Sequence, residues 1–138
     1  MGERDQRAQR GSDRPVVAWA PSLIWAALIF VLSAQPDLRL LPDQNVDFIV
    51  RNIGHMGAFG ILALLFWRAL ATTARPRPWV AASVITVVYA ITDELHQAGV
   101  IGRYASAVDV AIDAAGALVA VAAGGLVQAV RARRDASA

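Results

Sequence analysis

Four long apolar runs are the feature that most constrains how this chain can fold. Each is about 19 to 24 residues long, and together they cover residues 16–34, 53–74, 79–97 and 107–130. As an α-helix, a run of this length measures about 28–36 Å, which matches a hydrocarbon core of about 30 Å. Because chain inside lipid must satisfy its own backbone hydrogen bonds, each run is predicted to be a transmembrane helix. The predicted fold class is therefore all-α, a polytopic membrane bundle of four transmembrane helices.

Composition agrees with a membrane protein. Hydrophobic residues make up 57% of the 138 residues and charged residues 17%, against about 45–50% and 25% in soluble domains. The length suits one domain, residues 16–130, flanked by polar segments 1–15 and 131–138 that we expect to be disordered cytoplasmic tails. The first run is interpreted as a membrane helix rather than a cleaved signal peptide, because it is longer than the usual apolar region and Pro21 interrupts it.

The arginines predict the orientation. All 13 basic residues are arginine. Ten lie in the two tails or near the link after the second run, and three lie in the other two connections. Positive charge concentrates on the cytoplasmic side of membrane proteins. We therefore expect both termini and the 75–78 link in the cytoplasm, and residues 35–52 and 98–106 outside. This distribution follows topology and does not suggest a nucleic-acid partner.

With this orientation, polar residues from all four runs gather in the outer leaflet. Ionisable groups inside a membrane are expensive, and they are functional candidates by default. Asp93, His96 and Gln97 share one helix face by spacing, and Asp109 and Asp113 share another. Arg103, in the short loop between these faces, suits a carboxylate or phosphate. The predicted ligand-binding residues are Gln35, His55, Asp93, Glu94, Gln97, Arg103, Asp109 and Asp113.

Structural roles remain open for the same residues. Glu94 lies off the Asp93 face and either joins the site or reaches headgroup water. The set of Asp93, Arg103 and Asp109 can also be an ion-pair network that fixes helix register. The absence of cysteine excludes zinc-thiolate sites and thiol nucleophiles. No cofactor and no bound metal is predicted.

An ordered set of short motifs resembles the VanZ-like membrane proteins between about residues 23 and 126. The motifs are Ser33-Ala34-Gln35-Pro36, His55 with an aromatic residue four positions on, Asp93-Glu94-x-x-Gln97, Gly102-Arg103-x-x-Ser106, and Asp109 followed by Gly116. Two positions depart from the family pattern: Asp113 stands where asparagine is usual, and Phe59 where tyrosine is frequent. An extra acid beside Asp109 favours binding of a proton or cation.

The resemblance implies a multi-pass protein of the bacterial cell membrane, connected with tolerance of teicoplanin, a glycopeptide that binds cell-wall precursors. The function we favour is binding of an amphiphile, lipid headgroup or wall precursor at the outer leaflet. One alternative is an enzyme on a lipid-linked substrate, with Asp93 or His96 as general base and Asp109 as an orienting acid or metal ligand. A small ion- or proton-coupled carrier is a third hypothesis. The sequence settles neither the ligand nor the oligomeric state.

The topology can be tested by cysteine labelling. Single cysteines at positions 41, 76 and 101 should react with a membrane-impermeant maleimide from outside at 41 and 101 only, because the arginine distribution places the 75–78 link inside. Labelling after permeabilisation is the control. Reaction at 76 with protection at 41 and 101 would invert the orientation.

Overall fold

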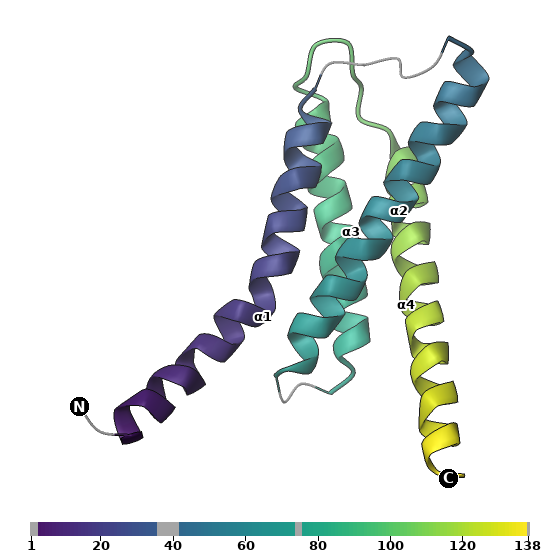
Figure 1. Cartoon of the computed structure of the whole chain (residues 1–138). Coiled ribbons are helices and arrows are strands. Elements are labelled where there is room, and N and C mark those ends of the chain that lie inside the picture. Colours follow the sequence, from purple (N-terminus) through teal and green to yellow (C-terminus); the bar gives the residue numbers. More distant parts are fainter. Residues whose placement is uncertain (1–2, 36–41, 74–75, 138) are drawn as a thin grey trace.

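The computed structural model describes residues 3–35, 42–73 and 76–137, and all the regular structure in these ranges is α-helical. Helix α1 runs over Glu3–Ser33, α2 over Gln44–Ala71, α3 over Pro78–Gln97 and α4 over Ala107–Asp135. Figure 1 shows the four helices running up and down, with the N- and C-terminal ends at the lower end of the bundle. The C-terminal end of α1, the start of α2 and the α3–α4 loop lie at the upper end. The predicted all-α architecture is confirmed.

Length and composition make three of these helices, α2, α3 and α4, able to cross a membrane. The apolar part of α1, Val17–Ser33, is shorter and covers about 26 Å of helix axis. The chain is therefore a multi-pass helical membrane protein. A fourth span and the cytoplasmic location of the termini stay predictions.

The helices extend into both segments expected to be disordered. Helix α1 begins at Glu3 and α4 continues to Asp135, so helical backbone crosses both predicted domain boundaries. Alanine and arginine are strong helix formers, and they make up most of the last turns of α4. The division into a membrane domain and two tails stays a prediction.

Aromatic side chains from α2 fill the core of the bundle. Phe59, Leu62 and Phe66 are buried together with Ile29 of α1 and Ala90 of α3. Because lipid tails are as apolar as the core, packing and hydrogen bonds hold such helices together rather than the hydrophobic effect.

Two hydrogen bonds from aromatic side chains attach α1 to its neighbours. The indole Nε1 of Trp25 donates to the Ala58 carbonyl of α2 at 2.9 Å. The Tyr89 hydroxyl of α3 donates to the Ala26 carbonyl at 2.6 Å. These bonds fix both the depth and the rotation of α1 against the bundle.

Helices α2 and α4 approach backbone to backbone. A Cβ atom at Gly116 would lie 2.7 Å from Cα of Met56 and nearer still to its carbonyl oxygen. A Cβ at Gly60 would lie 3.2 Å from the Gly116 carbonyl oxygen. Only glycine allows the first contact, which is the packing role expected of a small residue between membrane helices.

Gly116→Ala should therefore separate α2 from α4 and destabilise the protein by about 1–3 kcal/mol, as overpacking does. Thermal unfolding in detergent measures the change. Gly57→Ala on α2 is the matched control, because nothing lies within 4 Å of the position that its new methyl group would occupy. Equal melting of the two variants would contradict the close approach.

Candidate functional site

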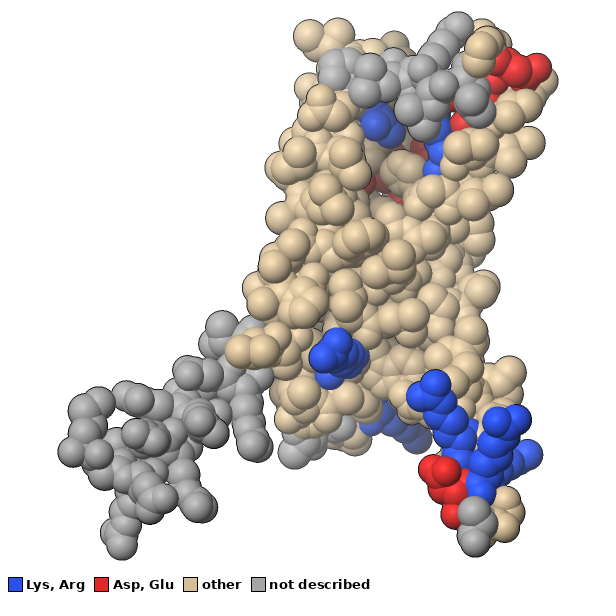
Figure 2. All heavy atoms as spheres, viewed as in Figure 1, with Lys and Arg blue, Asp and Glu red and all other residues tan. Residues whose placement is uncertain are grey.

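A polar cavity of about 210 Å³ opens between α2, α4 and the α3–α4 loop at the upper end of the bundle. Figure 2 shows a hollow at this end that contains basic and acidic side chains, while the surface across the middle of the bundle is uncharged and further basic side chains appear at the lower end. Six charged or polar residues of the lining carry the argument: Arg51, His55, Gln97, Arg103, Asp109 and Asp113. We call this space the polar cavity.

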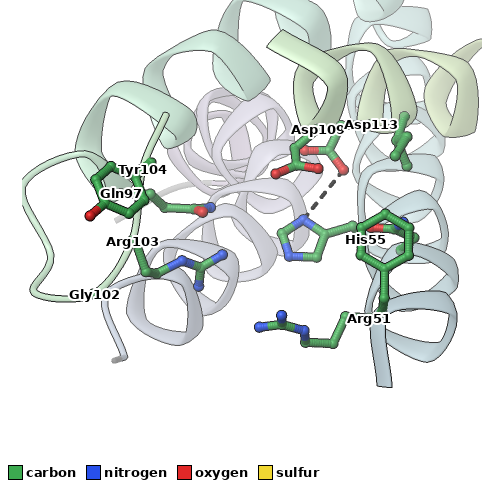
Figure 3. Close-up of a pocket in the computed structure, with 11 residues that line it drawn as sticks. Arg51, His55, Gln97, Gly102, Arg103, Tyr104, Asp109 and Asp113 are labelled. Carbon is green, nitrogen blue, oxygen red and sulfur yellow. Dashed lines mark ion pairs between the residues drawn. The ribbon is translucent and has the colours of Figure 1, made fainter. Parts of the chain in front are cut away.

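Positive and negative groups enter the polar cavity from different sides. Figure 3 shows the guanidinium groups of Arg51 and Arg103 reaching toward a common space, with the carboxylates of Asp109 and Asp113 beyond the His55 ring. Asp113 has no solvent-exposed surface, whereas Arg103 and Asp109 are half-buried. The cavity therefore has a basic side near its mouth and an acidic side in its interior.

His55 and Asp113 face each other across the polar cavity from α2 and α4. Nδ1 of His55 lies 3.4 Å from Oδ1 of Asp113, an ion pair when the imidazole is protonated. The ring also stacks one turn along the helix with Phe59, at 6.4 Å between centroids and 13° between planes. A buried carboxylate on one side and an aromatic ring on the other fix the orientation of the imidazole.

Asp93 joins three segments beside the cavity. Its Oδ2 atom accepts hydrogen bonds from the Ser33 hydroxyl of α1 at 2.7 Å and from Gln97 Nε2 at 2.8 Å. Arg103 donates to the Ser33 carbonyl at 3.5 Å. This carbonyl can accept the bond because carbonyls at the end of a helix have no hydrogen-bond partner within the helix. Asp93 and Arg103 therefore meet through Ser33, and the structure shows no direct ion pair between them.

Glu94 holds the start of α4. It is buried, and its carboxylate accepts a hydrogen bond from the Ser106 backbone N–H at 2.8 Å. The Ser106 hydroxyl in turn caps α4 by accepting from the Asp109 N–H at 3.2 Å. Through this contact Glu94 positions the first turn of α4, which carries Asp109.

Four predicted site residues do not line the polar cavity: Asp93 and Glu94, described above, and His96 and Gln35. His96 stacks on Phe30 of α1, with 4.0 Å between ring centroids and 21° between planes. Gln35 is exposed and donates to the Val31 carbonyl of its own helix. Neither residue lines the cavity. Of the three catalytic candidates, Asp93, His96 and Asp109, only Asp109 lines it.

Residues that sequence reasoning missed lie on the first turns of α2. Arg51 and Asn52 line the cavity, and Arg51 pairs with Asp47 at 3.4 Å, one turn earlier. The spacing of Asp47, Arg51 and His55 at steps of four places them on one helix face. This periodicity is a signal in the sequence that identifies Arg51 as a candidate site residue. In the arginine distribution, Arg51 serves only as an indicator of topology.

Three helices able to cross a membrane, a fourth helix packed on them and a charged cavity at one end define a small multi-pass membrane protein. The sequence model of the VanZ/LLP1 family matches residues 6–128. The chain belongs to this family, and the match confirms the resemblance of the motifs. No curated protein and no solved structure matches the chain.

The Asp93 contacts predict the effect of removing the Ser33 hydroxyl. Ser33→Ala should lower stability by about 1–3 kcal/mol, because it takes a donor from a buried carboxylate. Unfolding in detergent is the measurement. Thr92→Ala is the control, since that exposed hydroxyl donates only to the Tyr89 carbonyl of its own helix. A Ser33→Ala variant as stable as Thr92→Ala would show that the contact is dispensable.

Proposed function

We propose that this protein binds an amphiphile at the outer leaflet, with the charged headgroup in the polar cavity and an acyl chain in an adjoining apolar groove. The observation that carries the proposal is a second cavity of about 270 Å³ at the α1–α2 junction. It shares His55 and Arg103 with the polar cavity. We call it the apolar groove; the residues that make it apolar include Ile29, Leu32, Ala58 and Phe59.

The basic side of the polar cavity suits an anionic group. A guanidinium has five N–H donors, and the hydrogen bond from Arg103 to the Ser33 carbonyl uses one of them, at the long distance of 3.5 Å. Its planar fork can hold two oxygens of a phosphate or carboxylate. Arg51 adds a second positive charge beside it while paired with Asp47. A phosphate at the mouth of the cavity would join two arginines.

The arginine distribution supports an outward-facing cavity. The polar cavity lies at the end of the bundle opposite the termini (Figure 1). If the termini are cytoplasmic, this end lies where lipid-linked wall precursors and glycopeptide antibiotics are found. We therefore propose a cell-envelope role in the cell membrane that contributes to tolerance of teicoplanin-type glycopeptides.

A membrane enzyme is the second candidate, and the His55–Asp113 pair is the observation that favours it. A histidine oriented by a buried carboxylate is a general base in many hydrolases. The pair, at 3.4 Å, would act on a lipid-linked substrate held by Arg103. In this candidate mechanism His55 is the general base, the role for which the sequence predicts Asp93 or His96.

The binding function predicts distinct effects for the two cavities. Arg103→Gln should weaken binding of an anionic phospholipid about tenfold or more, because it removes a charge-assisted contact. Gly54→Leu should block the apolar groove, since Gly54 lines it and has open space at its Cβ. Native mass spectrometry of the purified protein with phosphatidylglycerol measures both.

Matched controls lie on α2, outside the lining of both cavities. Arg68→Gln removes a charge from the last turn of α2, and Gly57→Leu makes the same change facing a different groove. Unchanged binding in Arg103→Gln and Gly54→Leu would contradict the proposal. The same variants, expressed in a glycopeptide-sensitive bacterium, should lose teicoplanin tolerance at equal membrane abundance. A loss that only tracks protein amount would leave a structural role for Arg103.

A further inference from the structure

We propose that the polar cavity selects a zwitterionic headgroup, with a primary ammonium against Asp113 and Asp109 and a phosphate against Arg103 and Arg51. The inference rests on the amphiphile-binding function proposed above and specifies its ligand class. It starts from the acidic side of the cavity, which an anionic ligand alone would leave without a partner.

Asp113 is a buried carboxylate that lacks hydrogen bonds. The residue has no exposed surface, and neither carboxylate oxygen has a hydrogen-bond partner in the described part of the chain. Its charged neighbour, His55, is 3.4 Å from Oδ1, which leaves Oδ2 without a contact of this kind. A buried carboxylate is costly unless it is paired and hydrogen-bonded. Asp113 therefore has capacity for a donor from a ligand.

Asp109 supplies a second carboxylate one helical turn away on the same face of α4. Its backbone N–H is used by the Ser106 cap. Its carboxylate lines the polar cavity (Figure 3), and no hydrogen bond or ion pair to it occurs among the described residues. Two carboxylates on consecutive turns can share the three N–H donors of a primary ammonium.

The basic side of the cavity makes a simple cation an unfavourable ligand. Arg51 and Arg103 reach into the same space as Asp109, with His55 between the two charge types (Figure 3). A lone cation would face two guanidinium groups, and a lone anion would face two carboxylates. A molecule with both charges, a few bonds apart, matches the basic and the acidic sides together.

Size and chemistry narrow the class further. The cavity of about 210 Å³ suits a small headgroup rather than a sugar chain. Quaternary ammonium groups are recognised by aromatic cages. Here oxygen acceptors line the acidic side, so N–H donors are favoured. Phosphoethanolamine, free or as a lipid headgroup, has this chemistry.

The test compares lipids with identical acyl chains in nanodiscs: phosphatidylethanolamine, phosphatidylglycerol and phosphatidylcholine. We expect phosphatidylethanolamine to bind about tenfold more tightly than the other two, because a hydrogen bond to a charged group is worth about one such factor or more. Free phosphoethanolamine is the additional competitor. Displacement by it at millimolar concentration would indicate recognition of the soluble headgroup, whereas failure to displace would assign the site to the lipid.

Charge-neutral variants decide the role of the carboxylates. Asp113→Asn and Asp109→Asn should each abolish the preference for phosphatidylethanolamine and leave phosphatidylglycerol binding unchanged or tighter. Asp135→Asn, at the exposed end of α4, is the matched control. Retained phosphatidylglycerol binding that is still sensitive to Arg103→Gln shows that a variant is folded. If Asp113→Asn does not fold, Asp109→Asn gives the same comparison.

The outcomes separate this inference from the function on which it rests. Equal binding of the three lipids, with both aspartate variants silent and Arg103→Gln still harmful, would overturn the zwitterion and keep the amphiphile. Absence of binding by every lipid, with Arg103→Gln silent, would overturn both.

Discussion

The buried carboxylate of Asp93 is the interaction on which the upper end of the bundle depends. It binds the last residue of α1 through Ser33 and the last residue of α3 through Gln97. Arg103 reaches the same Ser33 from the loop. A buried carboxylate is costly unless it is hydrogen-bonded, so loss of either partner would destabilise this end of the bundle. The adjacent Glu94 extends this order to the first turn of α4.

This arrangement explains why the polar cavity can hold charge without collapsing. Asp93 and Glu94 use their hydrogen bonds to position segments, and the cavity lies between the segments that they position. The carboxylates that do face the cavity, Asp109 and Asp113, come from α4 instead. The acidic residues of α3 therefore hold the helix ends and the loop in place, while those of α4 line the cavity. The division follows from which helix faces the open space.

The sequence predicted the helices and the gathering of polar residues at one end, because apolar length and helix direction determine both. It did not predict the contact partners. Asp93, His96 and Gln97 span an arc of about 100° on a helix, which is wide enough to touch two neighbours. The structure turns Asp93 and Gln97 inward and stacks His96 on Phe30 of α1. Pairing of His55 with Asp113 depends on how α2 crosses α4, and spacing within one helix carries no information on that crossing.

The contact between Gly116 and Met56 has a consequence for the depth of the cavity. Met56 follows His55 in the chain, and Gly116 lies one turn beyond Asp113, so the two backbones meet immediately below the deepest charged pair. Substitution of side chains can change the chemistry of the walls of the polar cavity. The space beneath these walls is closed by backbone atoms of α2 and α4. In a bundle with this crossing, a deeper cavity would require the two helices themselves to move apart.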